Sequence, residues 1–359
     1  MAQSKRINFK GQNIYVGIDV HLKSWHVTVL TESGFKRKFS QPSSAHALFE
    51  HLQKHYPGGI YHAVYESGFT GFSTYYSLVS YGIKCIIAHA ADIPVGQYES
   101  VMKTDAVDSE RLARALREDS LRSTVYVPSK KLLDHRGILR FRTLLQKQLG
   151  GYKSRVKHLL HSNGVPFPDC FSRLSTHWSR RFMQWLRDEV RLISPTRETL
   201  DLLLAQIDKL RADLLSVTRR IRQLSRTEPY TSRVKLLLSV PGIGMLTAMH
   251  LLTEVEKPER FSGQRAFASY LGLVPTCHDS GEKKGTGEMT FRGNKRLRTL
   301  LVESSWIAIR QDCALAACYG EFRKRMEPQE AIVRIARKLS NRILCVLKTG
   351  KKYEYDRCC

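Results

Sequence analysis

The sequence predicts an α/β domain followed by two mainly helical regions. Strand and helix patterns alternate over the first 128 residues. Apolar residues spaced alternately three and four apart then fill residues 200–224, and helix–turn patterns dominate from residue 227 onward. Because 359 residues are many for one compact unit, we expect several domains. We predict them at residues 1–128, 129–226 and 227–359.

The first region begins with a strand over residues 13–19 (NIYVGID), where apolar residues alternate with others up to Asp19. Further strands are predicted over residues 24–30, 35–39, 59–66 and 83–88. Helices are predicted over residues 43–56 (capped by Ser43 or Ser44), 71–81, and from Asp105 to about Leu116 with Thr104 as N-cap. The order β-β-β-α-β-α-β-α is that of an RNase H-like fold.

Four acidic residues occupy converging positions in that topology. Asp19 ends the first strand, Glu66 ends the fourth, and Asp105 and Asp108 share one face of the last helix. Taken singly, each has an ordinary structural explanation, such as a turn former or a solvated helix residue. Taken together, oxygen ligands without a Cys/His pattern suit Mg²⁺ or Mn²⁺. Glu110 lies off the 105/108 face and is expected to be solvated or paired with Arg114.

Two histidines, His21 and His26, lie near Asp19 in the sequence. A histidine near a strand usually contributes to packing, so we assign neither a role.

The middle region is strongly basic, with 21 basic and 8 acidic side chains in residues 130–226. Residues 130–162 predict a long helix. From Leu200 to Leu224, steps of three and four residues continue over nearly four heptads, which indicates a coiled coil. This repeat could pair with the 130–162 helix of the same chain or with a second chain, and periodicity does not distinguish the two.

The last region contains LLLSVPGIGMLTAMHLL (236–252), which fits a helix-hairpin-helix pattern. Its glycines, Gly242 and Gly244, would let backbone N–H groups approach a phosphate. A tight turn between two helices is the alternative, and the basic character of the chain favours phosphate contact. A Gly/Lys-rich loop with Ser280 follows. No neighbouring His–Asp pair activates this serine in the manner of a triad. The basic residues expected to hold a nucleic-acid backbone near the loop are Lys283, Lys284, Arg292, Lys295, Arg296 and Arg298. Residues 328–350 predict the closing helix, with Pro328 in its first turn.

The net charge of +25 favours a polyanionic partner, because each neutralised phosphate releases counterions. No apolar run reaches the ~20 residues that span a bilayer, and the N-terminus lacks a signal sequence. The eight cysteines form no metal-ligand spacing, which suggests reduced thiols in a cytoplasm and no structural zinc. The terminal Cys358–Cys359 pair has no explanation beyond a frayed tail.

Several stretches together resemble the DEDD insertion-sequence transposases. These are relatives of the pilin-gene invertases and include bridge-RNA-guided recombinases. In order, the stretches are GIDVH, VYESGFTG, KTDAVDSERLA, PGIG, AFASYLGLVP, DSG and RGNKRLRTLL, and they cover about 14–118 and 235–305.

The resemblance implies a RuvC-like N-terminal domain whose metal ligands are Asp19, Glu66, Asp105 and Asp108. It also implies that Ser280 attacks DNA and forms a phosphoserine linkage. It further implies donor and target DNA as substrates, a structured bridge RNA as guide, and a homo-oligomer, a dimer that assembles to a tetramer, whose subunits share a composite site.

Three other interpretations stay open at this point. The nearest is a metal-dependent nuclease of the Holliday-junction-resolvase kind, which would use water and leave Ser280 without a role. An actin-like sugar kinase is disfavoured by the charge and by the lack of a later Gly-rich adenosine loop. A nucleic-acid-binding protein without catalysis is the third.

Overall fold

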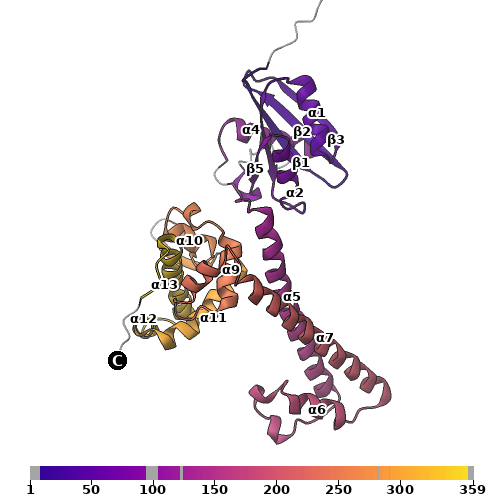
Figure 1. The fold of residues 1–359 in the computed structure, drawn as a ribbon, viewed down its shortest axis with the longest axis vertical. Helices are drawn as coiled ribbons and strands as arrows, with labels where there is room; N and C mark the ends of the chain where they lie inside the picture. The colour runs from indigo at the N-terminus through magenta and orange to yellow at the C-terminus, as the bar shows by residue number, and fades with distance from the viewer. Residues whose placement is uncertain (1–8, 94–103, 122–123, 281–282, 291, 355–359) are drawn as a thin grey trace, which may run out of the picture. The chain divides into compact units, whose positions relative to one another are not determined.

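A computed structural model describes residues 9–93, 104–121, 124–280, 283–290 and 292–354 (Figure 1). The chain divides into two compact units, Met1–Pro128 and Ser129–Cys359. The first boundary coincides with the one expected from the sequence, and the further division at residues 226/227 stays a prediction. The Cys358–Cys359 pair lies outside the described residues.

The first unit is built on a five-stranded mixed sheet in the order β3-β2-β1-β4-β5. β1 pairs antiparallel with β2 and parallel with β4, so β1 lies at the centre of the sheet. The strands are β1 (Asn13–Val20), β2 (Ser24–Thr31), β3 (Lys36–Pro42), β4 (Ile60–Glu66) and β5 (Lys84–Ala88).

Helices cover both faces of this sheet. One face packs its buried side chains, among them Val16 and Tyr65, against α1 (Ala45–His55) and α2 (Ser73–Ser80). Ser44 caps α1 by accepting a hydrogen bond from the amide of Ala47. On the other face, α4 (Asp105–Arg117) crosses β1, β2 and β4, with Leu112 packed against Val64. Every strand and helix predicted for residues 13–117 is therefore present, with bounds that differ by a few residues.

The second unit begins with α5 (Lys130–Ser162), a helix of 33 residues that packs along α7 (Ser194–Leu224). Leu149 and Val156 of α5 meet Leu200 and Ile207 of α7 in one core, which α6 (Arg180–Asp188) completes. The expected repeat on α7 therefore has a partner within its own chain. All eight seam positions from Leu200 to Leu224 are buried or half-buried.

The rest of the unit is a helical core around α13 (Pro328–Thr349) with one small hairpin (Figure 1). α8 (Thr231–Leu237) and α9 (Met245–Val255) flank the PGIG turn. The sequence predicts a loop around Ser280, whereas the backbone there forms two antiparallel strands. The remaining elements are α10 (Gln264–Tyr270), β6 (Pro275–Ser280), β7 (Lys283–Met289), α11 (Lys295–Gln311) and α12 (Cys313–Arg323).

Within the described part of the chain, no helix is long and apolar enough to cross a membrane.

Candidate active site

Two of the predicted acids lie side by side at one edge of the central sheet. Ile18 of β1 pairs with Tyr65 of β4 in parallel register, so the next residues along each strand are Asp19 and Glu66. Side chains alternate between the two faces of a strand. Because Val16, Ile18 and Tyr65 belong to the core on the α1/α2 side, Asp19 and Glu66 are directed to the α4 side. Glu66 is exposed.

The position of α4 over this edge depends on a glycine. A Cβ atom on Gly17 of β1 would lie 2.0 Å from the carbonyl oxygen of Ser109 and 2.4 Å from the amide nitrogen of Ala113. The buried hydroxyls of Thr28 and Ser109 also form a hydrogen bond of 2.8 Å between β2 and α4. This close contact brings the first turn of α4, with Asp105 and Asp108, to the end of β1.

His21 lies between the carboxylates of Asp19 and Asp105, and His26 contacts Asp105 as well. The Nε2 atom of His21 lies 3.2 Å from Oδ2 of Asp19 and 3.5 Å from Oδ2 of Asp105. Nε2 of His26 lies 3.3 Å from the same Asp105 oxygen. Ligand atoms of Asp19, His21 and Asp105 all lie within 4.8 Å of one another, close enough to coordinate one ion.

The electrostatics of this cluster favour a bound cation. The pKa of Asp19 is raised, mainly by burial, although His21 opposes the shift; the negative charges of Asp105 and Asp108 raise it further. Asp108 forms an ion pair of 3.1 Å with Arg111, one turn further along α4. Carboxylates held together against their mutual repulsion are a donor set that suits a divalent cation.

The structure therefore brings only two of the four predicted acids into one possible metal-binding group. Asp19 and Asp105 contribute atoms to the three-residue group, whereas Asp108 and Glu66 lie on the same face without joining it. The oxygen donors at this edge fit a divalent metal ion.

Sequence reasoning missed the two histidines. In the β1–β2 hairpin, His26 pairs directly with Asp19, which places both side chains on the α4 face. A signal was available, because the short connection between β1 and β2 fixes the hairpin register. His21 follows Asp19 by two residues, and only the path of the connection brings its ring back to the carboxylates.

Glu110 does not belong to this cluster. Its carboxylate forms ion pairs with Lys36 at 2.9 Å, Lys38 at 2.5 Å and Arg114 at 3.1 Å. Burial alone would raise the pKa of Glu110, but these hydrogen bonds outweigh it and lower the pKa to about 2. The expected pairing with Arg114 is present, and Glu110 fixes α4 to β3.

Ser280 belongs to the second unit, at the end of β6 in a hairpin that we call the serine hairpin (residues 275–289). Its backbone pairs with Lys283 at the tip, and Pro275 pairs with Met289 at the foot. The side chains of Ser280, Lys283 and Lys284 lie outside the described part of the structure.

A buried carboxylate holds the chain that leaves this hairpin. Glu254 of α9 is 3% exposed and accepts two hydrogen bonds from Arg140 of α5, at 2.9 and 3.0 Å. It also accepts one at 3.2 Å from Asn294, the N-cap residue of α11. Burial tends to raise the pKa of Glu254, but Arg140 and Arg136 outweigh it, so the pKa is lowered.

The predicted nucleic-acid contacts differ in their surroundings. Arg298 donates hydrogen bonds to the carbonyl oxygens of Gly272 and Thr290, so it holds the foot of the serine hairpin. Arg296 lies 3.9 Å from Glu254. Arg292 and Lys295 are exposed at the start of α11. Contacts of these four with nucleic acid stay predictions.

The two glycines of the PGIG turn also differ. Gly242 has a φ of +77°, and a Cβ atom there would lie 2.2 Å from the carbonyl oxygen of Ser304 on α11. Its amide donates to the side chain of Gln311 at 2.8 Å. Close packing against α11 therefore explains why a glycine occupies position 242. Gly244, the N-cap of α9, has open space at its Cα.

Comparison with known proteins matches both units to one group of transposases. Residues 16–163 match the family model of the IS110-type DEDD transposase domain, described as a transposase. Residues 234–320 match the model of the Transposase IS116/IS110/IS902 family. The first match contains Asp19, Glu66, Asp105 and Asp108, and the second contains Ser280.

Similar individual proteins carry related descriptions. The putative transposase y4qE of Sinorhizobium fredii is 27% identical over 81% of this chain and 66% of its own length. The transposase for insertion sequence element IS1533 of Leptospira borgpetersenii is 26% identical over 82% of this chain and 85% of its own. The pilin gene-inverting protein of Moraxella bovis is 29% identical over 39% of this chain and 45% of its own. On these matches, the chain belongs to the IS110 family of DEDD transposases.

Proposed function

We propose that this chain is an insertion-sequence transposase that exchanges DNA strands through a serine nucleophile assisted by a divalent metal. The observation that carries the proposal is the cluster of Asp19, His21 and Asp105 at the edge of the sheet where Glu66 ends its strand, with Asp108 close enough to raise the pKa of Asp19. The strand order and the helix across the β1 edge further favour an RNase H-like, specifically RuvC-like, first unit.

Asp19, Glu66, Asp105 and Asp108 would hold Mg²⁺ or Mn²⁺, and His21 offers an additional nitrogen donor. When bound, the metal would supply positive charge to phosphate oxygens and stabilise the attacking and leaving oxygens. Glu110 and Gly17 keep α4 in place so that the carboxylates stay aligned.

The proposed reaction is a transesterification. A bond forms between the Oγ atom of Ser280 and a DNA phosphorus while the bond from that phosphorus to a sugar oxygen breaks. The sugar oxygen leaves as a hydroxyl and takes up the proton that the serine loses. The number of phosphoester bonds is conserved, so a strand can later be rejoined by the reverse attack without an external energy source.

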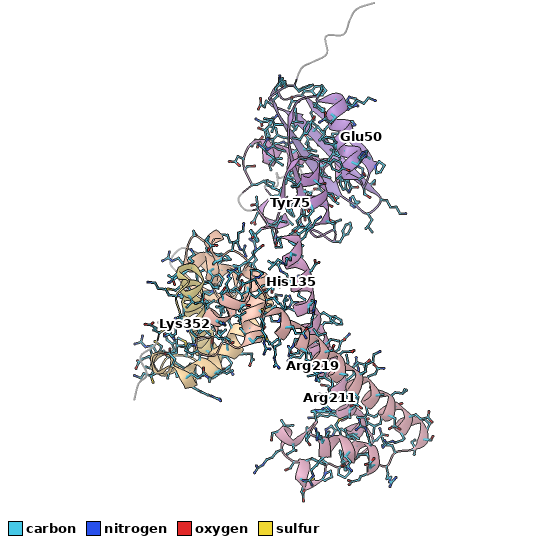
Figure 2. All side chains as sticks on the ribbon, viewed as in Figure 1. Glu50, Tyr75, His135, Arg211, Arg219 and Lys352 are labelled. Atoms are coloured by element: carbon cyan, nitrogen blue, oxygen red, sulfur yellow. The ribbon has the colours of Figure 1, made fainter. Side chains whose placement is uncertain are left out.

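The basic second unit is proposed to bind the nucleic acids. Arg211 and Arg219 lie on α7 (Figure 2), in the segment that carries 21 of the basic side chains. We infer that a structured bridge RNA pairs with donor and target DNA on this surface and on Lys283, Lys284, Arg292 and Lys295. The open N-terminus of α9 at Gly244 is the part of the helix-hairpin-helix available for phosphate. Acids and serine would come from different subunits of a homo-oligomer.

The test uses the full chain with its guide RNA and both DNA substrates. Ser280→Ala should abolish covalent protein–DNA adducts and strand exchange, and Asp105→Asn should reduce both at least a hundredfold. Ser262→Ala, at an exposed serine outside the hairpin, should leave them unchanged. Adduct formation that persists in Ser280→Ala would remove the serine from the mechanism.

A second candidate is a metal-dependent nuclease that resolves DNA junctions with water. It is favoured by one observation: all four predicted acids belong to the first unit, so a metal site there would need no residue of the second unit. Full cleavage by Ser280→Ala together with no cleavage by Asp105→Asn would support the nuclease.

A further inference from the structure

A cavity of about 650 Å³ lies at the foot of the serine hairpin, a volume in the range of small-ligand sites. Pro275 and Met289, which pair with each other in the hairpin, form one wall. The opposite walls come from α12 and α13, which pack side by side (Figure 1). None of the catalytic residues proposed above lines this cavity.

The floor of the cavity is apolar and includes an aromatic ring. Phe322 of α12 and Val333 of α13 join Met289 to form it. Phe322 and Val333 are half-buried and pack at the margin of the helical core, so their exposed surfaces are held in place. Such a floor suits a flat apolar group, because stacking on an aromatic side chain is favourable for every nucleobase.

Three cations stand above this floor on one face of α13. Arg334, Arg337 and Lys338 line the cavity, and the guanidinium of Arg334 lies 5.8 Å from the centre of the Phe322 ring. Among the residues that the structure describes, no carboxylate forms an ion pair with any of the three. An aromatic floor beneath unneutralised arginines matches a ligand with one flat face and one anionic group.

Polar groups complete the wall. Glu330 and Asn341 lie one turn before and two turns after Arg334 on α13. A carboxylate accepts hydrogen bonds from exocyclic amino groups of bases, and an amide can both donate and accept. A carboxylate such as Glu330 would repel a simple anion, whereas it could accept a hydrogen bond from the amino group of a nucleobase.

A second cavity of about 340 Å³ shares Met289, Gln329 and Val333 with the first. Trp306 of α11 lines it and offers another ring on the far side of Val333. Adjoining cavities with one aromatic residue each, bordered by cations, are the arrangement by which proteins bind successive bases of a single strand.

We propose that the two cavities bind unpaired nucleotides of the DNA strand that Ser280 attacks. The phosphates would lie on Arg334, Arg337 and Lys338, and the bases on Phe322 and Trp306. This inference rests on the proposed function for its choice of DNA. Ser280 follows Pro275 by five positions along β6, about 17 Å at the usual rise per residue. The cavities therefore hold the strand a few nucleotides from the bond that is cut.

Binding of fluorescent oligonucleotides tests this proposal without any chemistry. The full chain carries Ser280→Ala, divalent ions are omitted, and the probe is a single strand of about 20 nucleotides containing 2-aminopurine, compared with its duplex and with RNA of the same sequence. Arg334→Ala/Arg337→Ala should weaken single-stranded DNA binding at least tenfold. The slope of the logarithm of the binding constant against the logarithm of the salt concentration should also become shallower by about 1.4, the value for two phosphates of a single strand.

Two further variants separate the cavities from general charge. Lys351→Ala/Lys352→Ala removes the same charge just beyond α13 (Figure 2) and should change binding less than threefold. Gln329→Trp, at an exposed position shared by the two cavities, should block base binding and leave the salt slope unchanged.

Equal weakening by the two double variants would overturn the proposal, as would equal effects on single strand and duplex. Tighter binding of RNA than of DNA would also overturn it and assign the cavities to the guide. The binding experiment does not measure covalent adducts. A negative binding result would therefore leave the serine mechanism standing, and the binding result could still be interpreted if the serine mechanism proved wrong.

Discussion

Gly17 and Ser109 are in such close contact that no side chain fits between β1 and α4 at this point. A Cβ atom on residue 17 would lie only 2.0 Å from the carbonyl oxygen of Ser109. Asp19 lies two residues later on the same strand, and the same helix begins four residues earlier, at Asp105. The spacing of the two carboxylates is thus fixed by a contact that involves neither of them.

The first prediction concerns Gly17→Ala. The added methyl group meets backbone atoms on both Ser109 and Ala113, so α4 must move away from β1. We expect a loss of about 3 kcal/mol in unfolding free energy, measured by urea denaturation. We also expect at least tenfold weaker Mn²⁺ binding, measured by calorimetry.

Gly68→Ala is the matched control for this variant. Its new methyl group meets only the carbonyl oxygen of Glu66, at an ordinary 3.9 Å. Both stability and Mn²⁺ affinity should stay near the parent values. A Gly17→Ala protein with unchanged metal affinity would show that α4 does not position the ligands.

The second prediction concerns Asp105→Asn in the absence of metal. Burial raises the pKa of Asp19, and the negative charge of Asp105 raises it further because the two carboxylates repel each other. At pH 8 the variant should be more stable than the parent by roughly 0.5 kcal/mol in metal-free buffer. Adding Mg²⁺ should raise the melting temperature of the parent and leave that of the variant unchanged.

Glu50→Gln provides the control for that measurement. Glu50 lies on α1, which covers the opposite face of the sheet, and it is exposed (Figure 2). This variant should keep the full Mg²⁺-dependent stabilisation. If Asp105→Asn were also stabilised by Mg²⁺ to the same extent, the ion would bind elsewhere.

The third prediction concerns the buried carboxylate of Glu254. Glu254→Gln leaves Arg136, which is 8% exposed, and Arg140 without their anionic partner. Breaking a buried ion pair in this way costs about 3 to 5 kcal/mol, and thermal unfolding of the second unit should report it. Glu259→Gln, at an exposed carboxylate of the same region, should change stability by less than about 0.5 kcal/mol.

A double variant tests the cause of this loss. Replacing Arg140 with Met in the Glu254→Gln protein removes one of the unpaired cations. It should restore part of the stability because the two substitutions are coupled. Strict additivity of the two losses would argue against the ion pair.

The fourth prediction concerns the pH dependence of stability through His250. Burial lowers the pKa of His250 to about 4, since the neighbouring Glu254 only partly opposes the effect. The unfolded chain binds a proton near pH 6.5, but the folded chain does not until about pH 4. The contribution of His250 to stability is therefore complete above pH 6.5. It declines as the pH falls toward 4, by at most about 1.4 kcal/mol per pH unit.

His250→Leu should remove this dependence. The Nδ1 atom of His250 is buried and has no hydrogen-bond partner among the described residues, so its loss leaves no partner unsatisfied. Urea midpoints measured at pH 7 and pH 5 should differ less for the variant than for the parent. An identical pH response in the two proteins would place the titrating group elsewhere.

Much of the first unit was predictable because strand and helix periodicities are local properties of the sequence. The alternation at residues 13–19 places Asp19 at a strand end, and strand order brings Glu66 beside it. His26 was missed although the hairpin register, which the short connection fixes, places it opposite Asp19. His21 escaped prediction because its closeness to the acids depends on the path of residues 21–23. Neither the composition nor the spacing of those residues encodes that path.

The second unit was less predictable for a related reason. The repeat from Leu200 to Leu224 predicts a helix with an apolar seam, but only folding shows that this seam packs against α5 of the same chain. The serine hairpin was expected to be a loop because glycine-rich segments carry few strand-forming side chains. Glu254 gave no signal at all, since a single glutamate in an apolar helix acquires its arginine partners only through folding.

α5 contributes to two separate cores along one unbroken helix. Leu132 and Leu139 pack with the helices around α13, whereas Leu145, Leu149 and Val156 pack with α7. Each residue added between Leu139 and Leu145 would turn one set relative to the other by about 100°. Length changes here are therefore restricted to near-whole turns, such as seven residues. The length of α5 can therefore change only in such steps if the core around α13 and the core shared with α7 are to keep their relative orientation on the helix.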